Sequence, residues 1–147
     1  MGTKRSVVLV AMALAALAGC SSGPTSMGII YGDPTGLAVR HKAQSDRTIN
    51  FALGVTALDA NIGHGHIDYM FHFDRIRRGD PTFYVGVGAT YLFRVDDNNN
   101  NTDVGFGPRV PFGVSFQGRD FDLFLQGAAY FVGDLDFSWA VGVRFGI

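Results

Sequence analysis

The sequence predicts an all-β protein, a single up-and-down antiparallel β-barrel of eight strands. Three observations predict it. Apolar residues recur with a period of two over most of the chain after residue 46, as in strands with two different faces. The composition disfavours helices, because all 13 acidic residues are Asp, Lys42 is the only lysine beyond residue 4, and 20 residues are Gly. Thirteen Phe and five Tyr favour strands instead.

The first 19 residues (1–19) are predicted to be a lipoprotein signal peptide. Lys4 and Arg5 precede an apolar stretch that ends in Leu-Ala-Gly-Cys at residues 17–20, the arrangement of a secretory signal. Cleavage before Cys20 leaves its amine and thiol free to carry acyl chains, palmitate among them. The alternative is an ordinary secretory signal with an incidental cysteine, but Cys20 is the only cysteine and lies where a lipoprotein signal requires it. The apolar stretch is shorter than the ~20 residues of a transmembrane helix.

Residues 20–26 are then the acylated N-terminus and a short tether, and residues 27–147 form the barrel domain. The segment 27–42 fits either one bulged strand or a hairpin that turns at residues 33–36. We favour the hairpin, and therefore eight strands over seven, because an even number lets the first and last strands close antiparallel.

Six long strands are predicted after residue 46, each with apolar side chains at alternate positions. They cover residues 49–57, 66–74, 83–95, 104–116, 121–131 and 135–146. The pieces between them are rich in Gly, Pro, Asn, Asp and Ser, which favour turns. The predicted turns are residues 44–46, 59–65, 77–81, 96–103, 117–119 and 133–134.

The apolar face of these strands is predicted to point outward. In a soluble lipocalin-like barrel the apolar face points inward around a ligand, whereas in a membrane barrel it meets lipid and the polar face lines the lumen. The apolar face carries about thirty side chains, too many for an eight-stranded interior that is only just wide enough to be filled. The last four predicted strands, of 11 to 13 residues, also match the ~9–11 tilted residues that cross a bilayer. Phe51, Phe71, Val87 and Phe112 are therefore expected outside.

Charged side chains on the opposite face are predicted to form a hydrogen-bonded network in the lumen, because an unpaired charge in a dry interior is very costly. The predicted members are Arg40, Arg94, Arg109, Arg144, Asp68, Asp122 and Asp136. A narrow barrel filled by such a network is not an open pore. The alternative is that some members lie near the rims and are solvated.

Three residues of one predicted strand form the densest cluster of candidate metal-binding or catalytic groups. His66, Asp68 and His72 share a face, so a divalent metal site is conceivable. Their spacing matches no closed ligand set, and we favour hydrogen bonds to the arginine network, with no metal and no other cofactor. Ser115 and Ser138 are the hydroxyls available to an enzyme on this face, but no local sequence marks either as a nucleophile.

Several stretches resemble a family of small, eight-stranded outer-membrane-like β-barrels to which no activity is assigned. The stretches are residues 28–37 (GIIYGDPTGL), 45–48 (SDRT), 66–69 (His-x-Asp-Tyr), 71–74 (FHFD), 110–113 (VPFG), 121–125 (FDLFL) and 142–145 (GVRF). The resemblance covers residues 27 to 147 and implies an eight-stranded barrel, without catalytic residues to transfer. Members of that family usually have plain secretory signals, so the lipoprotein signal leaves two arrangements open, an inserted barrel and a barrel held only by its acyl chains.

These predictions favour a small outer-membrane lipoprotein that is not an enzyme, with a structural, envelope-integrity or surface-interaction role. Ser21 stands where Asp would retain a lipoprotein in the inner membrane, which favours the bacterial outer membrane. The expected partner is membrane lipid and not nucleic acid, because the chain after residue 19 has ten basic and 13 acidic residues and so is not positively charged. The barrel is expected to be a monomer. One alternative is a lipid-anchored periplasmic barrel that binds a lipid or another small hydrophobic ligand. Another is a small lipid-modifying membrane enzyme, with His66, Asp68 and His72 as the first residues to test.

Overall fold

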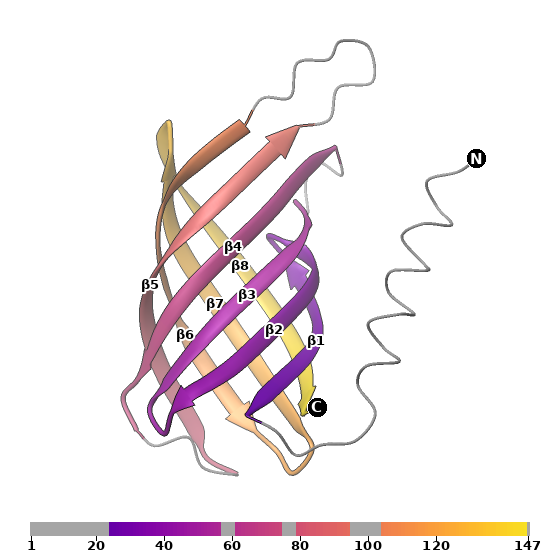
Figure 1. The fold of residues 1–147 in the computed structure, drawn as a ribbon, viewed down its shortest axis with the longest axis vertical. Helices are drawn as coiled ribbons and strands as arrows, with labels where there is room; N and C mark the ends of the chain where they lie inside the picture. Colours follow the sequence, from indigo (N-terminus) through magenta and orange to yellow (C-terminus); the bar gives the residue numbers. More distant parts are fainter. Residues whose placement is uncertain (1–23, 57–60, 75–78, 95–103, 147) are drawn as a thin grey trace, which may run out of the picture.

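The computed structural model describes residues 24–56, 61–74, 79–94 and 104–146. They form one closed barrel in which each strand pairs antiparallel with the next and the last strand pairs with the first (Figure 1). The strands are β1 (Thr25–Gly32), β2 (Thr35–Gln44), β3 (Arg47–Val55), β4 (Ile62–His72), β5 (Pro81–Arg94), β6 (Val104–Gln117), β7 (Phe121–Val132) and β8 (Asp134–Gly146). The predicted fold class and the number of strands are confirmed. No helix able to span a membrane occurs in the described part of the chain.

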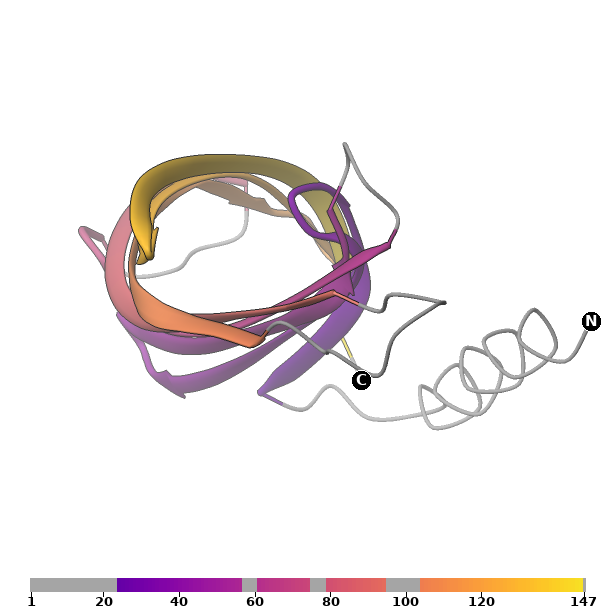
Figure 2. The same cartoon turned by 90° about the horizontal axis from the view of Figure 1, so that it is seen from above.

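Both ends of the barrel wall lie at the same end of the molecule. β1 begins and β8 ends at the lower end in Figure 1, and the view along the barrel in Figure 2 shows the ring of strands closed around its axis. We call this the lower end, and the end that carries the β1–β2 and β7–β8 turns the upper end.

The hairpin at the start of the barrel is confirmed, with its turn between Gly32 and Thr35. Gly32 has a φ of 129°, which favours glycine. The Thr35 hydroxyl donates to the Gly32 carbonyl at 2.8 Å and accepts from the Gly32 amide at 3.1 Å. β1 starts at Thr25, two residues before the predicted start of the barrel, because Thr25 pairs with His41 and extends the ladder.

The predicted turn at residues 59–65 is too long. Residues 62–65 already belong to β4, where Gly63 pairs with Val55 and Gly65 with Leu53. The two glycines suggest a turn, but both lie on the outer side of a strand, and the Phe93 ring covers Gly63. As a result His64 is not a turn residue; it points into the barrel and is fully buried.

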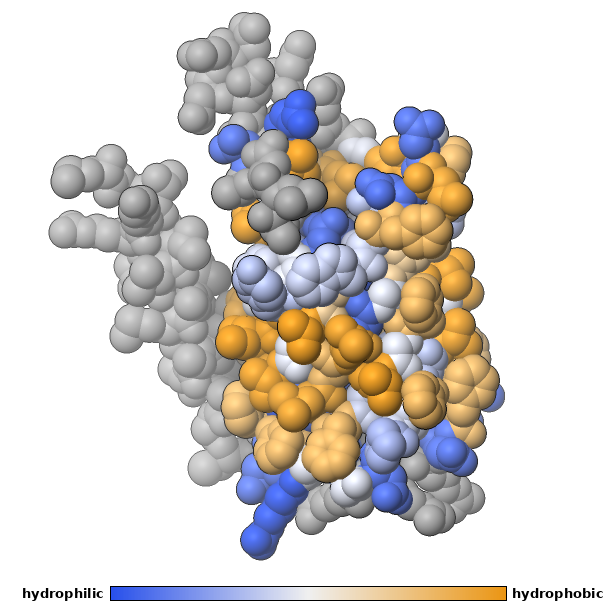
Figure 3. All heavy atoms as spheres, turned by 180° about the vertical axis from the view of Figure 1, so that it is seen from behind, coloured by the Kyte–Doolittle hydropathy of each residue, from blue (hydrophilic) through white to orange (hydrophobic). Residues whose placement is uncertain are grey.

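The faces of the strands are oriented as predicted, with large apolar side chains outside. Phe51, Phe71, Val87 and Phe112 are 47%, 42%, 58% and 52% exposed. Figure 3 shows apolar residues gathered around the middle of one face, with hydrophilic residues toward both ends. Burial alternates along β3, β5 and β7, and most inward positions are small or polar. The larger buried side chains among them are Ile30, Met70, Tyr84, Phe124 and Tyr130.

Glycines on the inner face make room for the buried charges. Gly88 of β5 stands in register between Asp68 of β4 and Arg109 of β6. A Cβ atom at Gly88 would collide with the Asp68 side chain and with the main chain of Ile67. The absence of a side chain at Gly88 therefore lets Asp68 and Arg109 meet across the intervening strand.

Replacing Gly88 with valine should lower the free energy of unfolding by about 2 kcal/mol, because the added atoms overlap buried groups that cannot move apart freely. Urea unfolding of the refolded barrel in lipid vesicles measures this change. Gly146→Val is the matched control, since no atom lies near the position of its Cβ. Equal unfolding free energies of the two variants would contradict the role given to Gly88.

Candidate functional site

Two clusters of buried charges fill the lumen, and the lower one is built on Asp122 of β7. Its Oδ2 atom accepts from Arg144 of β8 through Nε at 2.9 Å and Nη2 at 2.8 Å. Arg40 of β2 places Nη1 3.0 Å from the same oxygen. The Arg144 guanidinium also lies 4.0 Å from the centre of the Phe124 ring, a cation–π contact. All three charged side chains are buried, so two cations share one carboxylate out of contact with water.

The second cluster joins Asp68 and Arg109. Arg109 Nε donates to Asp68 Oδ2 at 3.2 Å, and its Nη1 donates to the Ser138 hydroxyl at the same distance. His66 Nε2 lies 3.5 Å from Asp68 Oδ2. This cluster ties β4, β6 and β8 together across the interior.

Two predicted members of the network, Arg94 and Asp136, are not part of it. Arg94 is exposed at the end of β5, and Asp136 is exposed near the start of β8. Asp136 accepts from the Tyr130 hydroxyl at 3.2 Å and from the Phe137 amide at 2.8 Å. Both residues sit where their strands approach the upper rim, so water can solvate them and no buried partner is required. The other five predicted members form the two clusters.

A third group of polar residues pins the β1–β2 turn to the opposite wall. His64 Nδ1 lies 2.8 Å from Asp33 Oδ1, and His64 Nε2 lies 2.7 Å from the Thr90 hydroxyl. Asp33 belongs to the turn, whereas His64 and Thr90 come from β4 and β5. Figure 2 shows this turn, in indigo, curled inward at the mouth. Pro34 of the turn is fully buried, and together these residues obstruct the upper part of the lumen.

The order carboxylate, imidazole, hydroxyl is that of hydrolase triads, but burial argues against catalysis here. His64 and Thr90 are both 0% exposed, and Thr90 also donates to the Gly65 carbonyl at 3.3 Å. A substrate cannot reach this hydroxyl in the closed barrel. We assign the three residues to anchoring the turn. The sequence does not mark them, because Asp33 and Thr90 lie 31 and 26 positions from His64.

The candidate metal ligands do not converge. His66 approaches Asp68, whereas His72 lies nearer the lower end and bonds to the Thr48 hydroxyl through Nε2 at 3.1 Å. Within the described ranges, no group of three His, Cys, Asp or Glu side chains is placed to hold a metal ion. Cys20 and residues 1–19, the predicted signal peptide, lie outside the described residues, so cleavage and lipidation stay predictions.

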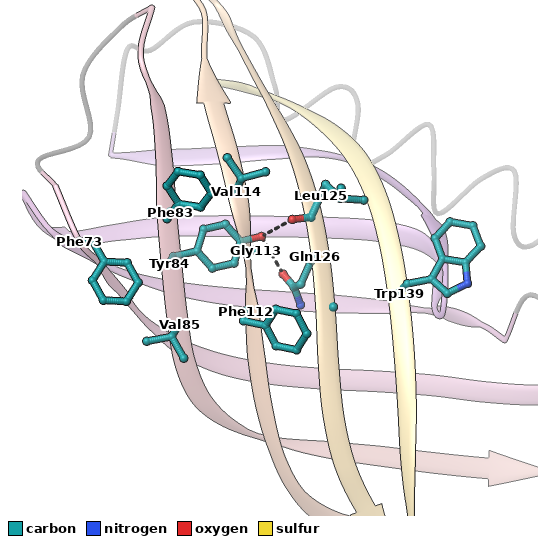
Figure 4. Close-up of a pocket in the computed structure, with 11 residues that line it drawn as sticks. Phe73, Phe83, Tyr84, Val85, Phe112, Gly113, Val114, Leu125, Gln126 and Trp139 are labelled. Carbon is teal, nitrogen blue, oxygen red and sulfur yellow. Dashed lines mark hydrogen bonds between the residues drawn. The ribbon is translucent and has the colours of Figure 1, made fainter.

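A groove of about 630 Å³ lies on the outer wall of the barrel. It runs across β5 to β8, with outward side chains such as Phe112, Leu125 and Trp139 along it (Figure 4). Gly127 stands in register between Phe112 and Trp139. The Tyr84 hydroxyl turns inward, 3.4 Å from the Leu125 carbonyl and 3.4 Å from Gln126 Oε1. The groove is therefore an apolar feature of the outer surface and not an internal ligand cavity.

No family model matches the chain, and no curated protein matches its sequence. Solved structures match it in fold. The N-terminal β-barrel domain of Pseudomonas aeruginosa OprF superposes with a TM-score of 0.63 at 11% identity, covering 85% of this chain and 98% of that domain. Neisserial surface protein A (NspA) gives a TM-score of 0.55 at 10% identity, covering 84% and 94%. The fold is that of the small eight-stranded outer-membrane β-barrels. At these identities the similarity extends to the fold alone.

Asp122→Asn should lower the free energy of unfolding by about 3–5 kcal/mol, because it leaves two buried guanidinium groups without a carboxylate. Chemical unfolding in vesicles measures the change. Asp120→Asn, at an exposed position two residues away, should shift the unfolding free energy by less than about 0.5 kcal/mol. Similar values for both variants would show that the lower cluster does not depend on the Asp122 charge.

Asp33→Ala should free the β1–β2 turn from β4. We expect a loss of about 1–2 kcal/mol in stability, because the buried imidazole of His64 loses its carboxylate partner. The amide of residue 33 donates to the Trp139 carbonyl at 2.9 Å, so its hydrogen exchange should accelerate as the turn opens locally. Exchange followed by NMR tests this, with Asp80→Ala at an exposed turn as the control. Unchanged exchange at residue 33 would contradict the anchoring role.

Proposed function

We propose that this chain is a small outer-membrane lipoprotein whose barrel spans the bilayer, with a closed lumen and a structural, envelope-integrity or surface-interaction role. The mature chain would begin at an acylated Cys20. The observation that carries the proposal is the polarity of the barrel: its apolar side chains face outward and its charges face the axis. This is the reverse of a soluble barrel and the pattern of a lipid-facing one.

The exposed apolar surface supports insertion. The large apolar side chains exposed around the barrel have exposed fractions of 38% to 72%, and they include Ile67, Phe83, Leu125 and Val141. A soluble monomer seldom exposes a continuous apolar surface of this size, because contact with water costs free energy over its whole area. The apolar groove across β5 to β8 belongs to the same surface and would be filled by acyl chains.

The lumen supports a role other than conduction. The Arg40–Asp122–Arg144 and Asp68–Arg109 clusters lie at different positions along the interior, and their side chains are buried. Opening a path would require separating paired charges in a medium of low polarity. The same clusters disfavour a tethered barrel that holds a hydrophobic ligand, since such a lumen should be apolar. A lipid-modifying enzyme built on His66 and His72 receives no support from their separate hydrogen bonds.

The orientation follows from the anchor. Acyl chains on Cys20 would lie in the inner leaflet of the outer membrane, and only a short segment separates Cys20 from Thr25. The lower end of the barrel, where β1 begins, would then face the periplasm. The upper end, with the β1–β2 and β7–β8 turns, would face outward.

Replacing Val87 with arginine distinguishes an inserted barrel from a soluble one. Val87 is 58% exposed near the middle of β5. In a bilayer an outward arginine at mid-depth should cost about 2–4 kcal/mol of folding free energy, whereas on a soluble surface the change should be close to neutral. Unfolding free energies in vesicles measure the effect, with Asp74→Arg, at an exposed position two residues after the end of β4, as the control. A neutral Val87→Arg variant would overturn the membrane assignment.

Fractionation tests the anchor and the insertion separately. Cys20→Ala, expressed with a cleavable secretory signal in place of residues 1–19, should remain in the membrane pellet after carbonate extraction and should migrate differently with and without heating in detergent. Loss of this variant to the soluble fraction would mean that the acyl chains alone hold the protein. Metabolic labelling with a palmitate analogue should mark the wild type and not the variant.

A further inference from the structure

The wall of the barrel is uneven at its upper end, and this leaves one strand edge open. β1 pairs with β8 from Ser26 opposite Gly146 to Gly32 opposite Ala140, and the Asp33 amide then donates to the Trp139 carbonyl. Above this point the chain turns inward, as the burial of Pro34 shows. β8 continues upward and pairs with β7 as far as Asp134. In Figure 1 the β7–β8 turn accordingly stands above the β1–β2 turn.

The segment of β8 at residues 134–138 therefore has a partner on only one side within the described part of the chain. The N–H and C=O of one residue in an antiparallel strand point to the same side, and the side alternates along the strand. Because the Trp139 carbonyl points toward β1, Leu135 and Phe137 also direct their backbone groups to the open side. Among the described residues, the Phe137 amide donates only to the neighbouring Asp136 carboxylate, at 2.8 Å.

The side chains beside this edge are apolar on one face of β8 and acidic on the other. Leu135 and Phe137 point outward and are 64% and 66% exposed. Below them, Tyr31 and Trp139 pack edge to face with ring centres 6.5 Å apart. Asp134 and Asp136 occupy the alternate positions and are also exposed. The open edge is thus apolar on its outer face and acidic on its inner face.

We infer that this edge is a docking site for an extended segment of another protein, which adds a strand beside β8. Exposed strand edges bind peptides in this way, with main-chain hydrogen bonds for affinity and alternate side chains for specificity. The bound segment carries apolar residues next to Leu135 and Phe137 and Lys or Arg next to Asp134 and Asp136. A backbone carbonyl of the bound segment accepts the hydrogen bond of the Phe137 amide in place of the Asp136 carboxylate. That carboxylate can then pair with a Lys or Arg of the segment.

Charge disfavours a second copy of this chain as the occupant. Antiparallel pairing of two β8 edges would bring Asp134 and Asp136 of one copy beside those of the other, and like charges on neighbouring strands are destabilising. Burial in hydrocarbon is excluded, because an open sheet edge is not tolerated there. The edge therefore lies beyond the apolar layer. The position of the edge relative to the bilayer and the side of the membrane on which the partner is met rest on the proposed function; the pairing does not.

Binding of a synthetic peptide in which lysine alternates with valine tests the inference on the refolded mature chain in detergent micelles. Fluorescence anisotropy should detect binding, and amide shifts in NMR should concentrate on residues 134–139. The same peptide with its edge-facing amides N-methylated should bind at least about fivefold more weakly, because it cannot form the ladder. A peptide of alternating glutamate and valine should not bind.

Leu135→Pro removes a donor from the open side without removing one that faces β7, as proline at a free edge does. This variant should lose at least about fivefold in affinity, whereas Leu135→Ala should retain the ladder and lose less. The double variant Asp134→Asn, Asp136→Asn should bind the lysine–valine peptide more weakly than the wild type and should bind a threonine–valine peptide with unchanged affinity. Circular dichroism and the heat-dependent shift in migration check that each variant is folded.

Several outcomes would overturn the inference. The inference fails if the lysine–valine peptide does not bind or if its N-methylated form binds equally well. It also fails if the amide shifts lie outside β8 or if the chain forms a dimer that blocks peptide binding. The N-methylated peptide keeps the test decisive even where Leu135→Pro fails to fold. The peptide assay uses micelles and no membrane fractionation, so its failure would leave the proposed membrane role intact. Conversely, a Cys20→Ala variant found in the soluble fraction would leave the pairing at the β8 edge intact.

Discussion

Charges held in an interior too narrow for free water are the constraint on which this barrel depends. An eight-stranded ring encloses only enough space for side chains, and here that space contains Arg40, Arg109 and Arg144 together with Asp68 and Asp122. Each cation must find an anion or a hydrogen-bond acceptor within a few ångströms. The pairs join strands that are distant along the chain, so they also stabilise the closed ring.

This constraint explains the distribution of small residues. Gly88 lies in register between Asp68 and Arg109, and the side chain it lacks leaves the space in which these two charges meet. Most bulky apolar residues lie on the other face of the strands, where they form the apolar surface, whereas Ile30, Met70 and Phe124 stay inside. The polar interior and the apolar exterior are therefore two consequences of one alternating pattern, and they support membrane insertion together.

The two ends of the barrel are built differently. At the lower end, the Asp122 cluster joins β2, β7 and β8, and the His72–Thr48 bond joins β3 and β4. At the upper end, the β1–β2 turn folds inward onto His64, while β7 and β8 rise above it. The inward turn closes the lumen, and the same turn ends the pairing of β1 with β8. Closure of the interior and the open edge of β8 are thus linked by the short β1–β2 hairpin.

The sequence by itself determined the all-β class, the eight strands and the face of each side chain, because period-two alternation and turn residues are local properties of the chain. Local signals misassigned residues 62–65, where Gly63 and Gly65 suggest a turn although both lie in β4. Only the tertiary structure decided which charges meet. The stagger of the closed strands brings Arg40 to Asp122, sets Arg94 and Asp136 at the rim, and joins Asp33 to His64. No short-range pattern encodes that stagger, since it is set by pairing around the whole ring.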